Sequence, residues 1–353
     1  MKRIKIGKKF IGDNCPFYTI AEIGSNFDNS LKKAYKLVDL AIEAGADAVK
    51  FQSFKAENLV SDVGFKKLKI GYQSKWKKSV TQVYKEAEFP RNWHKKVFNY
   101  CKKKKIDFFS APYDKQAVDD LNKLGVPAFK IGSGDITWLE NIKYIASKKK
   151  PIILATGASK MSEIRAAIET IRKTGNKKIV LLQCVTNYPA SFKNVNLKVL
   201  SLFKKEFNCL VGYSDHTPGS SVAIGSVALG GCMIEKHFTD NKKLPGPDHS
   251  FAMDKNDFKK MVNDIRHMER IMGKGKKRIY PEEENQYISM KRSIRAKYNL
   301  NSGTTIRRKD LVVLRPCEKN SLSANYLEDI IGKTLLKDVK KGISLKRKDI
   351  KFN

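Results

Sequence analysis

The chain has 353 residues, 41% of them hydrophobic, so it can bury a full core and is long enough for a barrel of roughly 250 residues plus a small module. Its formal net charge of +34 first suggests nucleic-acid binding, but Lys far outnumbers Arg and is spread over every segment, unlike the Arg-rich, aromatic surfaces of nucleic-acid binders. We therefore expect no nucleic-acid partner, and a basic field that attracts an anionic substrate.

Two further features bear on where the protein works. The first residues, MKRIKIGKKF, lack the apolar core of a signal peptide, and no stretch approaches the roughly 18 apolar residues of a membrane span. The six Cys residues are scattered without a Cys-x-x-Cys pair, which favours buried free thiols. We expect a cytoplasmic protein with no membrane partner.

Eight short apolar runs, rich in Val, Ile and Phe, occupy the first two thirds of the chain. They cover 19–26, 48–53, 108–114, 128–135, 152–157, 179–188, 210–216 and 233–238. Runs of this kind, separated by helical patterns, predict buried parallel strands with crossover helices. Eight of them in one domain predict an α/β fold of the (β/α)8 TIM-barrel type, with its chemistry at the carboxyl ends of the strands.

Amphipathic helices are predicted between the strands, most clearly at 31–46, 91–104, 161–175 and 254–275. The first closes on Gly45 and the last on Gly273, as helices often do. Residues 54–90 are longer than a simple crossover and contain Trp76 and Tyr84. This stretch is predicted to form a flap near the mouth of the active site.

The barrel domain is expected to span 1–275, followed by a polar linker at 276–292 and a separate module at 293–353. In the module, LNSGTTIRRKDL (300–311) closely matches VKKGISLKRKDI (339–350). Each copy has a turn glycine before an alternating, strand-like run. We expect a small β-rich domain with internal pseudosymmetry, and because it is small it should dock on a partner surface.

Two histidines are candidate metal ligands, since His216 ends the seventh predicted strand and His237 lies in the eighth. Neighbouring strands would bring the imidazoles together, and two neutral nitrogens with oxygen ligands and water suit Mn²⁺, Mg²⁺ or another divalent ion. Two hydrogen-bonded core histidines are the alternative. The acidic residues nearby favour the metal.

Lys50 and Lys130 lie inside apolar strands, where a charge is costly unless an anion is present. Lys130 leads into a Gly-Ser-Gly turn whose backbone N–H groups and Ser133 hydroxyl can approach a phosphate. Together with Ser214, these three residues could bind a ligand that carries both a phosphate and a carboxylate. The lysines could instead be neutralised by acidic neighbours, or one could form a Schiff base.

Three carboxylates complete the candidate site. Glu22 at the end of the first strand could act as an acid or base, bind a hydroxyl, or neutralise Lys50. Glu235 lies two residues before His237, so both can point inward, and it could orient water or protonate an alkoxide. Asp248, in a Gly/Pro loop, could accept hydrogen bonds from sugar hydroxyls.

Together these motifs resemble the sialic acid synthase family, which makes N-acetylneuraminic, legionaminic and pseudaminic acids. They are AEIGSN (21–26), VKFQ (49–52), KIGSG (130–134), TGAS (156–159), NYPA (187–190), GYSDHTPG (212–219), EKHFT (235–239), GPDH (246–249) and LRP (314–316). They occur in order over almost the whole chain. The resemblance implies a TIM barrel followed by a small antifreeze-like (SAF) domain, in a domain-swapped homodimer.

The resemblance also implies a reaction, the metal-dependent condensation of phosphoenolpyruvate with an N-acetylated aldose, N-acetylmannosamine or a 2,4-diacetamido hexose. Phosphate would leave by C–O cleavage, and the divalent metal would be Mn²⁺ foremost, with Mg²⁺ or Co²⁺ possible. His216 and His237 match its ligands, and together with Glu22 and Glu235 they are the expected catalytic groups. The residues expected to bind substrate are Lys50, Gln52, Ser110, Lys130, Ser133, Thr186, Tyr188, Ser214, Asp248 and Arg315, the last reaching the other protomer's site.

The chain departs from the family pattern at several positions. Ala111 and Ala155 replace residues that commonly carry a hydroxyl near the phosphate, and Thr186 stands where Asn is usual. These changes leave the His pair and the lysines intact but bear on the choice of sugar. Two alternative hypotheses remain. The chain could be a synthase that makes a different 3-deoxy-ulosonate from phosphoenolpyruvate, or a non-catalytic basic protein that binds nucleic acid or carbohydrate.

Overall fold

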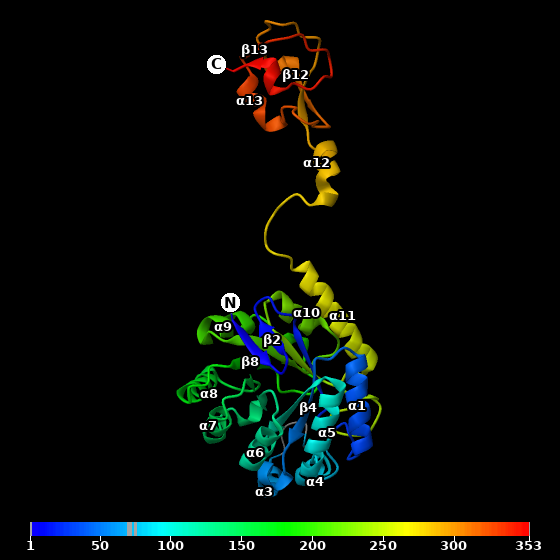
Figure 1. Cartoon of the computed structure of the whole chain (residues 1–353), viewed down its shortest axis with the longest axis vertical. Helices are drawn as coiled ribbons and strands as arrows, with labels where there is room; N and C mark the ends of the chain where they lie inside the picture. Colours follow the sequence, from blue (N-terminus) through cyan, green and yellow to red (C-terminus); the bar gives the residue numbers. More distant parts are fainter. Residues whose placement is uncertain (1, 69–72, 74–75, 353) are drawn as a thin grey trace. The chain divides into compact units, whose positions relative to one another are not determined.

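The computed structural model describes residues 2–68, 73 and 76–352, which divide into two compact units at 1–273 and 274–353 (Figure 1). The division after Gly273 lies close to the end of the last barrel helix. Among the described residues, no helix combines the length and apolar character that a bilayer crossing requires.

The first unit is built on an eight-stranded parallel sheet with the order β5-β4-β3-β10-β9-β8-β7-β6. The end strands β5 and β6 contact each other, so the sheet closes into a barrel. This confirms the predicted TIM-barrel fold. The strands are β3 (Tyr18–Glu22), β4 (Ala48–Ser53), β5 (Asp107–Pro112), β6 (Phe129–Ile131), β7 (Ile152–Ala155), β8 (Ile179–Cys184), β9 (Leu210–Asp215) and β10 (Met233–His237).

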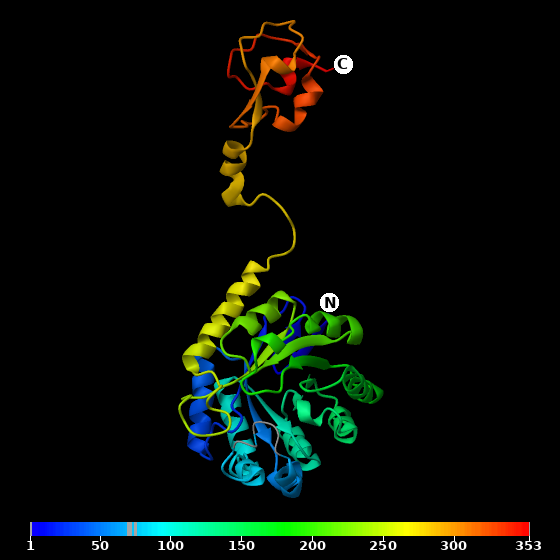
Figure 2. The ribbon, with the colours of Figure 1, turned by 180° about the vertical axis from the view of Figure 1, so that it is seen from behind.

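Helices surround the barrel on its outside (Figures 1 and 2). They are α1 (Leu31–Glu43), α5 (Arg91–Lys104), α6 (Lys115–Leu124), α7 (Leu139–Ser147), α8 (Met161–Lys173), α9 (Val199–Phe207), α10 (Ser221–Ala228) and α11 (Lys255–Ile271). Side chains of Ser30, Asp114 and Asp254 accept hydrogen bonds from backbone N–H groups in the first turns of α1, α6 and α11. These caps explain where the three helices begin.

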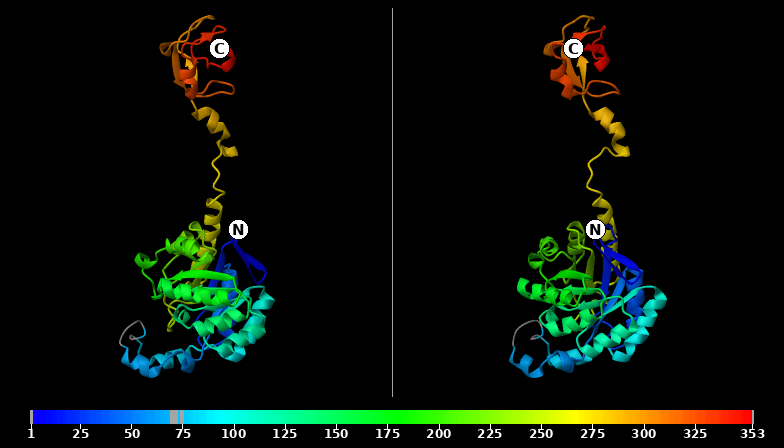
Figure 3. Two further views of the ribbon diagram at one scale, coloured as in Figure 1. Left: turned by 90° about the vertical axis from the view of Figure 1, so that its left-hand side faces the viewer. Right: turned by 60° about the vertical axis from the view of Figure 1, so that its left-hand side comes forward.

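The long connection between β4 and α5 contains three short helices, α2 (Ala56–Leu59), α3 (Asp62–Lys67) and α4 (Val80–Glu86). Figure 3 shows this segment, in blue, projecting from one end of the barrel. Part of the predicted flap, residues 69–72 and 74–75, lies outside the described residues.

Side chains alternate between the two faces of each strand, which decides what fills the barrel. Toward the amino ends of the strands the interior is apolar, with Tyr18, Ile20, Phe109 and Val180 in one buried cluster. The hairpin of β1 (Arg3–Ile6) and β2 (Lys9–Gly12) adds Ile6 and Ile11 to the same cluster. The amino end of the barrel is therefore filled, and the inward positions nearer the carboxyl ends are left to polar residues.

The second unit contains α12 (Glu284–Met290), α13 (Leu327–Ile330) and two antiparallel pairs, β11 (Ser293–Ala296) with β12 (Leu311–Leu314) and β13 (Thr334–Leu335) with β14 (Ile350–Lys351). The sequence repeat is also a structural one. Asp310 and Asp349 each accept a hydrogen bond from the backbone N–H three residues earlier, at 2.9 and 3.0 Å. Helix α12 lies within the stretch that the sequence predicts as a plain linker.

Candidate active site

A cavity of about 460 Å³ lies at the carboxyl ends of the barrel strands. Its lining includes polar side chains from seven of the eight strands or from the loops that follow them. Among these are twelve of the residues predicted from the sequence to act on substrates: Glu22, Lys50, Gln52, Lys130, Ser133, Thr186, Tyr188, Ser214, His216, Glu235, His237 and Asp248. Their convergence follows from strand register, since Glu22 pairs with both Lys50 and His237 across neighbouring strands.

The floor of the cavity is a buried cluster of two lysines and two glutamates, each side chain at most 6% exposed. Lys50 Nζ lies 2.7 Å from Glu22 Oε2 and 3.8 Å from Glu235 Oε1. Lys130 Nζ lies 3.1 Å from the same Glu235 oxygen. Gln52 donates to Glu22 Oε1 at 2.8 Å, and Ser214 donates to Glu235 Oε1 at 3.2 Å. Each buried charge thus has an opposite charge beside it.

The two carboxyl groups have different protonation behaviour. Burial raises the pKa of Glu22, and the nearby Glu235 charge adds to this, so that Lys50 offsets the rise only in part. Burial also acts on Glu235, but Lys130 and Lys50 outweigh it and lower the pKa to about 2. Environments that separate the pKa values of two carboxyls are typical of acid–base pairs. Glu22 is the group that takes up a proton more readily, while Glu235 stays ionised.

His216 and His237 lie side by side above this cluster, with ring centroids 5.5 Å apart. His216 Nδ1 donates to the backbone oxygen of Val185 at 2.8 Å, which leaves Nε2 directed elsewhere as an acceptor or ligand. Tyr188 packs on the His216 ring, with centroids 4.2 Å apart. Burial lowers the pKa of His237, so its imidazole is neutral at pH 7.

The two imidazoles are the donors that a divalent ion in this cavity would use. His237 Nδ1 is buried and has no hydrogen-bond partner among the described residues. Within that same part of the chain, no three His, Cys, Asp or Glu side chains are arranged to hold a metal. Two imidazoles could therefore hold a metal only with water or substrate as the remaining ligands, unlike a closed structural zinc site.

A tight turn borders the cavity beside Lys130. Ser133 Oγ accepts the backbone N–H of Gly157 at 2.9 Å, which ties the β6 turn to the turn after β7. A Cβ on Gly157 would lie 2.0 Å from Thr186 Oγ1 and 3.0 Å from Ser133 Oγ. Any side chain at this position would push the Thr186 and Ser133 hydroxyls away from where they lie. Ser133 and Thr186 line the same cavity as Lys130, and hydroxyl groups together with a lysine suit the binding of an anion.

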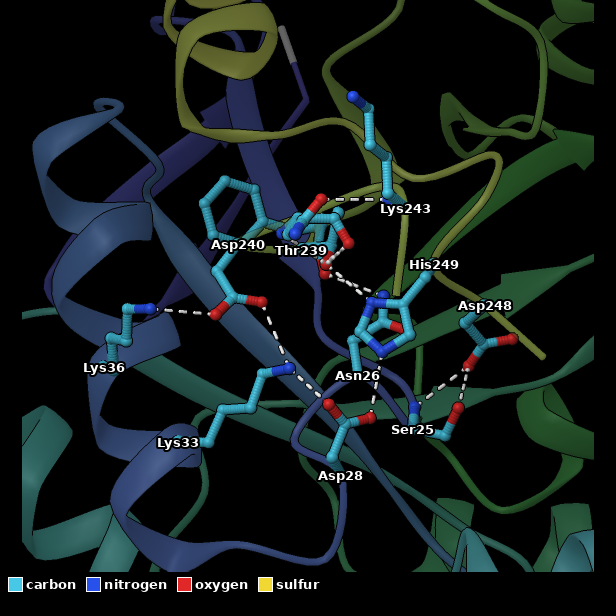
Figure 4. Close-up of polar contacts among 12 residues, drawn as sticks. Ser25, Asn26, Asp28, Lys33, Lys36, Thr239, Asp240, Lys243, Asp248 and His249 are labelled. Atoms are coloured by element: carbon cyan, nitrogen blue, oxygen red, sulfur yellow. Dashed lines mark hydrogen bonds and ion pairs between the residues drawn. The ribbon is translucent and has the colours of Figure 1, made fainter. Parts of the chain in front are cut away.

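Asp248 lies at the rim of the cavity, on the loop after β10 (Figure 4). Its Oδ2 accepts two hydrogen bonds from Ser25, from the backbone N at 2.9 Å and from Oγ at 2.8 Å. Gly24 permits this approach, since a Cβ there would lie 2.5 Å from the same oxygen. The carboxylate is therefore fixed in direction before any ligand binds.

Two predicted site residues are not in this cavity. Ser110 is buried on the outward face of β5, where its Oγ lies 2.6 Å from Ser53 Oγ and Ser53 in turn contacts His94 of α5. The structure corrects this placement, because Phe109 and Ala111 are the inward residues of the strand. Arg315 is exposed in the second unit, directly after β12.

The cavity also has walls that the sequence did not single out as substrate-binding. As the flap prediction requires, Leu59, Phe65 and Tyr84 from the β4–α5 connection line it. Tyr113 directly follows β5, in phase with the inward-facing Phe109 and Ala111, and lines the cavity as well. Asp135 is a further lining residue, and burial raises its pKa to about 6 although Lys130 opposes this. The inward alternation of β5 was the signal that would have identified Tyr113.

Comparison with known proteins agrees with the geometry. Residues 37–277 match the model of the NeuB family, and residues 291–351 match that of the SAF domain. The chain is 40% identical over 326 residues to N,N'-diacetyllegionaminic acid synthase of Campylobacter jejuni, covering 91% of this chain and 96% of that one. It is 38% identical over 343 residues to the protein of the same name from Legionella pneumophila, covering 96% of each.

The fold is shared with a solved structure, N-acetylneuraminic acid synthetase from Leptospira borgpetersenii in complex with citrate. The TM-score is 0.72 with 29% sequence identity, over 81% of this chain and 95% of that one. The family match covers most of the barrel, from residue 37 to residue 277, and each bacterial relative aligns with more than nine tenths of this chain. The chain belongs to the NeuB family, and it is an enzyme of the sialic acid synthase type with a carboxyl-terminal SAF domain.

Proposed function

We propose that this enzyme joins phosphoenolpyruvate, an N-acetylated aldose and water to give a nonulosonic acid and inorganic phosphate. C3 of phosphoenolpyruvate forms the new bond to the aldehyde carbon of the sugar, whose oxygen takes up a proton. Water then adds at C2, and the C2–O bond breaks so that phosphate leaves with its bridging oxygen. The observation that carries the proposal is the pair of buried lysines beneath a histidine pair in one cavity.

The lysine cluster supports binding of an anionic substrate. Lys50 and Lys130 are balanced by Glu22 and Glu235 when no ligand is present. Because the pKa of Glu22 is raised, this carboxyl takes up a proton more readily than an ordinary carboxyl, and protonation leaves the cluster with a net positive charge. Lys130 and the Ser133 turn would then hold the phosphate, with Lys50 at the carboxylate.

The separated pKa values assign different roles to the two glutamates. Protonated Glu22 can donate to the aldehyde oxygen as it becomes an alkoxide. Glu235 stays ionised between the lysines and the Ser214 hydroxyl, and so holds both ammonium groups in place. A metal bound by the histidine pair, Mn²⁺ in our proposal and otherwise Mg²⁺ or Co²⁺, would polarise the sugar aldehyde.

For the acceptor sugar, we propose a 2,4-diacetamido hexose ahead of N-acetylmannosamine. The two relatives described above are N,N'-diacetyllegionaminic acid synthases, which supports this order. Asp248 and Gln52 would bind sugar hydroxyl or amide groups, and Tyr188 would pack against the ring or an acetyl group. The apolar side chains from the β4–α5 connection suit acetyl and methyl substituents better than a chain of hydroxyl groups.

We further propose that the enzyme works in the cytoplasm as a domain-swapped homodimer, with Arg315 contributing to the partner's site. The six free cysteines are consistent with a reducing compartment. Light scattering of the full chain tests the dimer. Loss of activity in Arg315→Ala that returns on mixing with an inactive barrel variant carrying Arg315 would support sharing of sites between protomers.

The decisive experiment measures phosphate release from phosphoenolpyruvate with Mn²⁺, with and without each sugar. Release that depends on the sugar, is lost with His216→Ala and is kept with His267→Ala would support the proposal. His267 is a matched control because it lies exposed on α11, outside the cavity. Removing metal with a chelator and restoring it tests the metal. No release with any N-acetylated aldose would overturn the proposed function.

A further inference from the structure

His249 is a buried histidine that the proposed reaction does not use. It directly follows Asp248 in the loop between β10 and α11 and is 1% exposed. Its Nε2 lies 2.9 Å from Asp28 Oδ1, and its Nδ1 lies 2.7 Å from Thr239 Oγ1 (Figure 4). Both ring nitrogens are occupied, so His249 is not a candidate metal ligand. Its contacts instead join three segments of the barrel rim.

The loop after β3 holds the loop after β10 at two consecutive residues. Ser25 donates two hydrogen bonds to Asp248 Oδ2, and Asp28 accepts from His249. Figure 4 shows the two side chains extending from the loop to separate partners. Because neighbouring side chains are held at separate points, the loop cannot rotate about its own axis without breaking one set of contacts.

Asp28 is itself anchored. Its carboxylate pairs with Lys33 in the first turn of α1, and its backbone lies in the left-handed region with φ +47°. Lys33 also reaches Asp240 Oδ1 at 3.2 Å, and Lys36 reaches the second oxygen of Asp240 at 2.9 Å. Asp28, and with it His249, is therefore tied to α1 through Lys33, while Asp240 is a separate acceptor for the same lysine.

We propose that the contacts Asp28–His249–Thr239, called the loop clamp below, are a positioning device that fixes the Asp248 carboxylate for recognition of the acceptor sugar. This inference rests on the proposed function. Asp248 Oδ2 is taken up by Ser25, so the direction of Oδ1 depends on how firmly the loop is held. By holding the loop, the loop clamp keeps the Asp248 carboxylate in a single orientation. The acceptor sugar therefore binds to a carboxylate that is already positioned.

The test compares two clamp variants, His249→Gln and Asp28→Asn, with Asp240→Asn. Asp240 is the matched control because it pairs with Lys33, as Asp28 does, but forms no hydrogen bond or ion pair with His249 or Asp248 among the described residues. Its replacement leaves the Lys33–Asp28 pair in place. Each clamp variant should raise KM for the acceptor about tenfold, the scale of one lost hydrogen bond to a charged group. KM for phosphoenolpyruvate and the far-ultraviolet circular dichroism should stay unchanged, and Asp240→Asn should alter neither KM.

A double-mutant cycle decides whether the clamp acts through Asp248. In an Asp248→Asn background, His249→Gln should add no further rise in the acceptor KM, since the group that the clamp positions is already lost. Losses that multiply, or equal rises in both KM values, would overturn the inference.

If the parent enzyme turns over no sugar, the proposed function fails by itself. The rate of backbone hydrogen exchange in the loop then tests the loop clamp without any activity measurement. Faster exchange at 246–250 in His249→Gln but not in Asp240→Asn would support it, and unchanged exchange would refute it.

Discussion

Replacing Glu235 with Gln should destabilise the barrel more than any exposed charge change in the chain. The side chain is 6% exposed and has a lysine at 3.1 Å and another at 3.8 Å. Its pKa falls from 4.5 to about 2 on folding, and at about 1.4 kcal/mol per unit this corresponds to roughly 3 kcal/mol of stability at pH 7. Removing one partner of a buried ion pair costs about 3–5 kcal/mol, which agrees with this magnitude.

The sign of the pH dependence follows from the direction of the shift. Because the pKa of Glu235 is lower in the folded state, its contribution is present above the ordinary value of 4.5 and is lost as pH falls toward about 2. Glu22 acts in the opposite sense. Its raised pKa means that its contribution is present below the ordinary value and declines as pH rises through the folded-state pKa. Glu235→Gln should therefore cost more than Glu22→Gln at pH 7.

Urea unfolding followed by tryptophan fluorescence measures this cost for the barrel alone, because Trp76, Trp93 and Trp138 all lie in the first unit. Glu206→Gln is the control, since its ion pair with Arg165 is largely exposed and should contribute less than about 1 kcal/mol. Equal costs for Glu235→Gln and Glu206→Gln at pH 7 would refute the reasoning. So would a cost of Glu235→Gln that stays constant from pH 7 down to pH 3.

Three further outcomes are expected. Tyr113→Phe should raise KM for phosphoenolpyruvate about five- to tenfold with little change in kcat. Burial raises the pKa of this phenol well above its ordinary value, so the hydroxyl remains a hydrogen-bond donor in the cavity. An unchanged KM would exclude contact with that substrate. The pH profile of kcat/KM should contain an inflection near pH 6 that disappears in Asp135→Asn, and its persistence would exclude this carboxyl as the source. Gly157→Ala should lower kcat/KM about a hundredfold without unfolding the protein, because its Cβ would displace Thr186 and Ser133; near-normal activity would show that the turn adapts freely.

The barrel could be predicted from the sequence because its eight strands are short apolar runs in phase with reactive residues. Parallel strands end at one rim, so the order of the motifs was enough to bring Lys50, His216 and Glu235 together. The prediction that Ser110 lies in the cavity was wrong because it assigned this residue to the wrong face of β5. Side chains alternate across a strand, and a shift of one residue moves a hydroxyl from the cavity to the helix side.

Other features depend on contacts that no local pattern contains. The clamp around His249 joins residues more than two hundred positions apart, and nothing near either residue in the sequence points to the other. The pKa order of Glu22 and Glu235 depends on which lysines face each carboxyl. Helix α12 was missed because its polar composition is also typical of a linker.

The amino-terminal hairpin has a consequence for the order of events during turnover. It fills the barrel end opposite the cavity, so among the described residues the open side of the site is the one where Asp248 lies. A molecule bound at Asp248 would then lie between solvent and the two lysines. For the proposed reaction, we therefore expect the anion to bind before the sugar, and the larger product to leave before inorganic phosphate. Filling one end of the barrel thus favours an ordered mechanism, in which the ligand that binds last is the first to leave.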